Sequence, residues 1–154
     1  MSTVYLGLGT NLGDKEQNLH QAIDKIQERV GKILSLSAFY NSAPWGYISD
    51  NMFVNAVVCI STTFSPQEVL NITQEIEKEL GRKEKSIDAS YSDRVIDIDI
   101  LLYDSVILST DNLTIPHPLM IKRLFVMDPL AEIAPDIVIP GVNKTVMAIR
   151  NELK

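Results

Sequence analysis

The feature that most restricts the fold of this chain is the order of its periodic segments. Strands are predicted over residues 4–9, 33–40, 53–63 and 94–103, and helices over residues 15–29 and 66–80. The resulting order, β-α-β-β-α-β, is that of the ferredoxin-like arrangement, an α+β fold whose antiparallel sheet carries both helices on one face. Beyond Asp104 we expect shorter pieces divided by Pro116, Pro118, Pro129, Pro135 and Pro140. Many unrelated activities share this fold, so the order alone does not indicate a function.

Both helices have recognisable ends. Asp14 and Gln17 have capping-box spacing at the start of the first helix, as do Ser65 and Glu68 at the start of the second. Gly81 is a plausible stop for the second helix. The predicted inner stripes are Leu19, Ala22, Ile23, Ile26 and Val30 in the first helix, and Val69, Ile72, Thr73, Ile76 and Leu80 in the second.

Composition indicates one ordinary globular domain over residues 1–154. Hydrophobic residues make up 45% of the chain and charged residues 22%. The formal net charge of −6 argues against a nucleic-acid partner, and no apolar run is long enough to cross a membrane. We expect a cytoplasmic location, because the chain lacks a signal-like start and its single cysteine, Cys59, cannot form an internal disulfide. Cys59 itself is expected in the core.

The most informative short pattern is the alternation around Asp97 and Asp99. Neighbouring side chains of a strand point to opposite faces, so both aspartates share a face opposite to the isoleucines that flank them. Two carboxylates at this spacing repel each other and suit a pair of hard cations. A solvated strand face, or carboxylates paired with arginines, explains the same pattern.

A polar segment, residues 81–94, precedes this strand. It holds four of the 14 basic residues of the chain. Such a segment is able to fold over a polyphosphate beside the two aspartates. An ordinary solvated connection is the simpler interpretation.

Three further segments carry candidate residues. Phe53 and Asn55 share a strand face, and an aromatic ring beside an amide suits a flat heterocycle. His117 lies between two prolines and either meets phosphate oxygens or only hydrogen-bonds locally. The glycines of residues 7–13 do not match a dinucleotide or P-loop spacing, so we expect them to serve close packing and a turn.

Taken together, these segments resemble the 6-hydroxymethyl-7,8-dihydropterin pyrophosphokinase family over nearly the whole chain. The matching pieces are residues 9–13, 42–44, 53–56, 81–82, 94–101, 115–118 and 123–135. The resemblance implies that the hydroxymethyl oxygen of the pterin attacks the β-phosphorus of ATP, with AMP leaving, in folate synthesis. It also implies two Mg²⁺ ions, ATP as co-substrate and a small-molecule pterin as partner. We expect a monomer.

The resemblance also implies roles for individual residues. Arg82, Arg94, Asp97 and Asp99 would be catalytic, and the two aspartates would hold the metal ions. The pterin would be bound by Ser42, Ala43, Trp45, Phe53, Asn55 and Phe125. ATP would be bound by Glu77, Lys85, Tyr91, Arg94, Ile100, Thr114, His117, Pro118 and Arg123. The chain departs from the commoner family pattern at Glu84, Tyr91 and Asn112.

Two alternatives remain open at this point. The first is another magnesium-dependent phosphoryl or nucleotidyl transferase on the same fold. The second is a non-catalytic ferredoxin-like module that binds a small ligand, for which the two aspartates would be unnecessary.

Overall fold

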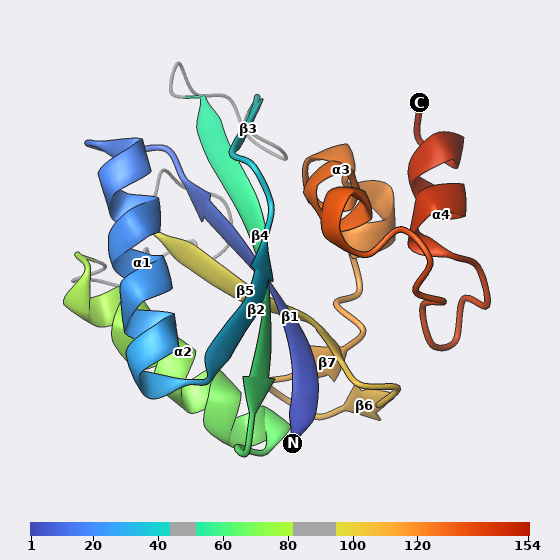
Figure 1. The fold of residues 1–154 in the computed structure, drawn as a ribbon, viewed down its shortest axis with the longest axis horizontal. Helices are drawn as coiled ribbons and strands as arrows, with labels where there is room; N and C mark the ends of the chain where they lie inside the picture. The colour runs from blue at the N-terminus through green and yellow to red at the C-terminus, as the bar shows by residue number, and fades with distance from the viewer. Residues whose placement is uncertain (44–51, 82–94) are drawn as a thin grey trace.

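The core of the molecule is an antiparallel sheet in the order β2-β4-β1-β5, with β3 pairing with β4 (Figure 1). The computed structural model describes residues 1–43, 52–81 and 95–154. Its strands are β1 (Ser2–Thr10), β2 (Lys32–Leu36), β3 (Tyr40–Ser42), β4 (Phe53–Thr62) and β5 (Asp97–Tyr103). Helices α1 (Lys15–Arg29) and α2 (Pro66–Glu79) cover one face. The predicted α+β, ferredoxin-like order is therefore confirmed.

The caps and inner faces of α1 and α2 agree with the sequence pattern. Asp14 accepts a hydrogen bond of 3.1 Å from the Gln17 N–H. Ser65 and Glu68 form a complete capping box, and Gly81 has a φ of 129° just beyond α2. Apolar side chains of both helices pack on the isoleucine side of β5 in one buried cluster. Within α2, Glu77 is also buried, which the apolar pattern did not indicate.

A second layer covers the other face of the sheet. It comprises η1 (Met120–Lys122), α3 (Leu124–Ile133) and α4 (Val146–Glu152), while β6 (Leu108–Ser109) and β7 (Thr114–Ile115) form a small hairpin. The prediction that Pro129 divides this region is wrong, because Pro129 lies inside α3. Pro129 is buried, and the free energy gained by burying its ring offsets the cost of the helical hydrogen bond that a proline cannot donate.

The strand predicted over residues 33–40 is two strands, β2 and β3. The break falls at Ser37, whose N–H donates to the Val57 carbonyl while its hydroxyl accepts from the Val57 N–H. A side chain thus replaces a backbone group in the ladder, and the chain bends before β3 begins.

The strand bearing the aspartates begins at Asp97, because the described residues just before it, Val95 and Ile96, lie outside the strand, and residue 94 is outside the described residues. Asp97 pairs with Gly9, and β1 ends one residue later, so little of β1 remains to extend the pairing. Farther along β5, a bulge opposite Tyr5 and Leu6 turns Leu101 and Leu102 both toward the second layer. No helix in the described parts of the chain is long and apolar enough to span a membrane.

Candidate active site

Asp97 and Asp99 lie on one face of β5, as the alternation predicted. Both are half-buried, and the intervening Ile98 and the following Ile100 are buried on the opposite face. The two aspartates help to line a pocket of about 310 Å³. Four other residues predicted from the sequence or the resemblance line the same pocket: Glu77, Ile100, Thr114 and His117. The fold therefore brings together residues from α2, β5 and the segment after β6.

Glu77 connects α2 to the free edge of β5. Its side chain is only 5% exposed, and Oε2 accepts a hydrogen bond of 2.8 Å from the Ile98 N–H. Ile98 lies between the two aspartates, so this bond holds the backbone from which both carboxylates project.

His117 is fixed on two sides. Its N–H donates to the Leu101 carbonyl at 3.0 Å, and its Nδ1 accepts from the Leu119 N–H at 3.2 Å. Burial, reinforced by the positive charge of Arg123 and opposed by Asp97, lowers the pKa of His117. The imidazole is therefore neutral at pH 7, and because Nδ1 is an acceptor, the proton lies on Nε2. His117 hydrogen-bonds locally and also faces the pocket.

A second group of predicted residues lies on β3 and β4. Asn55 is 5% exposed, and its amide nitrogen donates to the Ser42 hydroxyl at 2.8 Å and to the Tyr40 carbonyl at 3.2 Å. A Cβ on Gly9 would lie 3.3 Å from Asn55 Oδ1 and 3.7 Å from Phe53 Cδ1. Phe53 and Asn55 thus share a face over Gly9, and the expected close packing of this glycine is confirmed. Gly13, with a φ of 70°, supplies the expected turn.

The two groups are joined by a continuous cross-strand row. Asp97 pairs with Gly9, Gly9 with Asn55, and Asn55 with Tyr40. Directly paired residues face the same side of a sheet, and neighbouring strands lie about 4.8 Å apart. The backbones of Asp97 and Asn55 are therefore about 10 Å apart, and Gly9, which has no side chain, lies between them.

The remaining predicted residues have different positions. Phe125 lies in the first turn of α3, in the layer that covers this face, and the Arg123 guanidinium lies 5.5 Å from its ring centroid. Ala43 and Pro118 are exposed. Trp45, Arg82, Lys85, Tyr91 and Arg94 lie outside the described residues.

Comparison with known proteins identifies the family. The family model described as 7,8-dihydro-6-hydroxymethylpterin-pyrophosphokinase (HPPK) matches residues 5–135. A 2-amino-4-hydroxy-6-hydroxymethyldihydropteridine pyrophosphokinase of Porphyromonas gingivalis is 48% identical over 136 residues, or 88% of this chain and 92% of the relative. The enzyme of the same name from Aquifex aeolicus is 40% identical over 152 residues, or 99% of this chain and 92% of the relative. The chain belongs to the HPPK family.

This HPPK transfers pyrophosphate from ATP to the hydroxymethyl group of 6-hydroxymethyl-7,8-dihydropterin, giving AMP and the pterin diphosphate in folate biosynthesis. Crystal structures of HPPK-DHPS from Plasmodium falciparum share its fold, with TM-scores of 0.78 and 0.81 at 18% and 15% identity. The comparison covers 99% and 98% of this chain but only 43% and 44% of those longer chains.

Sequence reasoning assigned no role to several residues that the structure places in the pocket or beside Asn55. Gln74 and Asn112 line the pocket, and Tyr40 accepts a hydrogen bond from Asn55 through its carbonyl. Gln74 lies three residues before Glu77 in α2, so helical spacing from Glu77 would have found it. Tyr40 carried no such signal, because its contribution is made by its backbone.

Proposed function

We propose that the two groups of residues are the two substrate sites of this HPPK. The pocket between α2, β5 and β7 takes ATP, and the face of β3 and β4 under α3 takes the pterin. The observation that supports this division is the row from Asp97 through Gly9 to Asn55, since transfer requires the acceptor hydroxyl and the triphosphate to meet above one short stretch of sheet.

Asp97 and Asp99 are proposed to hold two Mg²⁺ ions. The donor set fits this metal, because Mg²⁺ prefers oxygen ligands and is usually bound by one or two carboxylates with water and substrate phosphates. In the described part of the chain, no group of three or more His, Cys, Asp or Glu side chains forms a fuller cage. Bound Mg²⁺ would neutralise triphosphate charge and polarise the attacked phosphorus.

In the ATP pocket, Glu77, Ile100 and Thr114 are proposed to contact the nucleoside. His117 is proposed to donate its Nε2 proton to a phosphate oxygen, which its neutral tautomer supports. Other phosphate and nucleotide contacts are assigned by resemblance to Arg82, Lys85, Tyr91, Arg94, Pro118 and Arg123.

In the pterin site, Phe53 and Phe125 are proposed to stack on the two sides of the ring. Asn55 is proposed to accept from the amide edge of the pterin through Oδ1, since its nitrogen already donates to Ser42 and Tyr40. Ser42, Ala43 and Trp45 are proposed to line the same edge. These residues would hold the hydroxymethyl group of the pterin toward Asp97, at the other end of the cross-strand row.

Single substitutions of the aspartates test the proposal. Asp97→Asn and Asp99→Asn should each lower kcat by about a hundredfold or more, because the amide keeps the shape but loses the charge. Products are resolved by mass, and circular dichroism checks the fold. Asp136→Asn, an exposed carboxylate after α3, is the matched control. Aspartate variants that retain kcat within tenfold of the wild type would refute the metal assignment.

We also propose that residues 1–154 act as a single-domain monomer in the cytoplasm, without nucleic-acid or membrane partners. The net charge of −6 supports this proposal. Light scattering during gel filtration tests it, and a mass of about twice 17.2 kDa would contradict it.

A further inference from the structure

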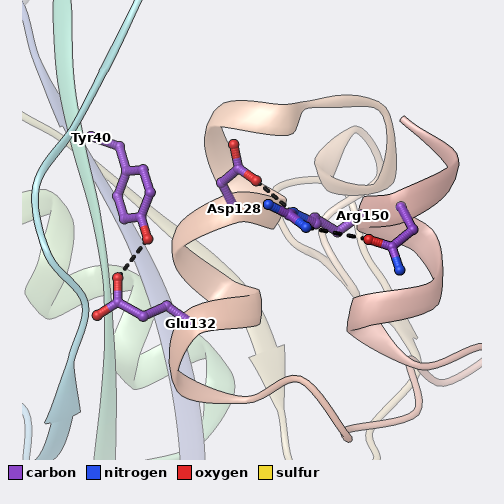
Figure 2. Close-up of polar contacts among 5 residues, drawn as sticks. Tyr40, Asp128, Glu132 and Arg150 are labelled. Atoms are coloured by element: carbon purple, nitrogen blue, oxygen red, sulfur yellow. Dashed lines mark hydrogen bonds and ion pairs between the residues drawn. The ribbon is translucent and has the colours of Figure 1, made fainter. Parts of the chain in front are cut away.

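A carboxylate on α3 ties the second layer to the sheet beside the proposed pterin site. Glu132 Oε1 accepts a hydrogen bond of 2.6 Å from the Tyr40 hydroxyl (Figure 2). Both oxygens of Glu132 also lie 3.1 Å from the Ala38 N–H, which donates to them. One side chain thus receives hydrogen bonds from the segment just before β3 and from β3 itself.

The strand that Glu132 holds also orients Asn55. The Tyr40 carbonyl and the Ser42 hydroxyl both accept from the Asn55 amide nitrogen. The hydroxyl of Tyr40 is therefore tied to α3 while its carbonyl is tied to Asn55. A shift of β3 relative to α3 would rotate the side-chain amide of Asn55, which we propose hydrogen-bonds to the pterin.

Glu132 and Phe125 lie on the same side of α3. They are seven residues apart, which is close to two helical turns, so their side chains project in nearly the same direction about 10 Å apart along the axis. α3 packs against both β3 and β4 on this side. The contact between Glu132 and β3 therefore helps to set the distance between the Phe125 ring on α3 and the side chains of Phe53 and Asn55 on β4.

We infer that Glu132 and Tyr40 are positioning residues for the pterin: their hydrogen bond fixes the spacing between the α3 side and the β4 side of the acceptor site. This inference rests on the proposed pterin site. Glu132 is exposed to solvent, but its two hydrogen-bond donors belong to the segment that holds Asn55, so the bond acts on the geometry of the site as well as on stability.

The same helix provides a matched control. Asp128, one turn before Glu132, accepts a hydrogen bond of 2.8 Å from Arg150 Nε and joins α3 to α4 instead of the sheet (Figure 2). Glu132→Gln and Asp128→Asn each change one carboxylate of α3 to an amide. Only the first alters the contact with β3. Glu132→Gln removes the negative charge and one of the two acceptor oxygens, so the hydrogen bonds from the Tyr40 hydroxyl and the Ala38 N–H are left to one neutral amide oxygen and become weaker.

The test is binding of 6-hydroxymethyl-7,8-dihydropterin in the presence of Mg²⁺ and an α,β-methylene analogue of ATP. Tyr40→Phe, which removes the hydrogen bond, and Glu132→Gln, which removes its charge assistance, should each raise the pterin Kd about threefold to tenfold. The Kd of the ATP analogue should stay within about twofold of the wild-type value, and Asp128→Asn should leave both constants unchanged. Unfolding temperatures are measured for every variant, and Tyr40→Phe serves if Glu132→Gln folds poorly.

Asn55→Ala separates this inference from the site on which it rests. If Asn55→Ala raises the pterin Kd while Glu132→Gln and Tyr40→Phe do not, the positioning role is refuted and the site stands. If none of the three variants changes the pterin Kd, the proposed site is refuted as well. Two other outcomes would also overturn the inference, because each would indicate a merely structural contact. In the first, Glu132→Gln weakens binding of the pterin and of the ATP analogue equally. In the second, Asp128→Asn weakens pterin binding as much as Glu132→Gln does.

Discussion

The carboxylate of Glu77 accepts a hydrogen bond from the backbone N–H of Ile98, the residue between Asp97 and Asp99. Among the residues that the structure describes, β5 is an edge strand, so this N–H faces away from β1 and has no partner in the described ladder. α2 therefore holds the acidic strand at the point where its two carboxylates project, and this relationship leads to the first prediction.

Replacing Glu77 should affect both stability and turnover. Glu77→Ala leaves the buried Ile98 N–H without its acceptor, which should lower the free energy of unfolding by about 1–3 kcal/mol. It should also lower kcat about tenfold or more, since the backbone between the aspartates is released. Glu77→Gln keeps an acceptor and should retain most of the stability. Urea unfolding and steady-state kinetics measure both effects.

An exposed glutamate on the same helix, Glu75, provides the control for that experiment. Glu75→Ala should change neither quantity appreciably. If Glu77→Ala behaved like Glu75→Ala, the hydrogen bond would have no role in holding β5.

Adding a methyl group at Gly9 should weaken pterin binding selectively. The new Cβ would lie 3.3 Å from Asn55 Oδ1, so the amide must shift. Gly9→Ala should raise the KM for the pterin about threefold to tenfold, the size expected when one hydrogen bond is misaligned, with the KM for ATP little changed. Gly7→Ala is the control, because the three atoms nearest to its Cβ all belong to the flexible side chain of Leu101. Equal effects on both substrates would contradict this prediction.

Removing the cap of α2 should lower stability without affecting catalysis. Ser65→Ala deletes the acceptor of the Glu68 N–H and should cost about 1 kcal/mol, which for a chain of this length lowers Tm by about 2–4 °C. Ser65→Asp retains an acceptor and should restore most of the loss. Calorimetry and kcat at 25 °C are the measurements, and a large fall in kcat would show that the start of α2 is coupled to the site.

The hydrogen bond between Tyr40 and Glu132 predicts a pH dependence of stability. That bond, followed by burial, raises the pKa of Tyr40 from 10.0 to about 12. The folded state holds the Tyr40 proton more tightly than the unfolded state. The contribution of this hydrogen bond to the free energy of unfolding is therefore complete below about pH 10 and is lost as the pH rises toward 12. The stability difference between wild type and Tyr40→Phe should therefore shrink above pH 10.

Urea unfolding of both proteins between pH 8 and about pH 11 measures this difference. Tyr5, whose pKa is also raised to about 12, is present in both proteins and cancels. A difference that stays constant through pH 11 would mean that Tyr40 does not titrate as its surroundings indicate.

Local features of this protein were predictable from its sequence because they depend on residues a few positions apart. The alternation that sets Asp97 and Asp99 on one face is such a feature, and so is the capping box of Ser65 and Glu68. The order of the elements, and with it the ferredoxin-like core, followed from the same short-range periodicities.

Only the tertiary structure decided which distant residues meet. The pairing of Gly9 with both Asp97 and Asn55, and the contact between Glu132 and Tyr40, depend on strand register and on how α3 packs on the sheet. The Pro129 helix and the break at Ser37 were mispredicted for the same reason. In these cases burial and cross-strand hydrogen bonding outweigh local propensity, and both are set by residues far away in the sequence.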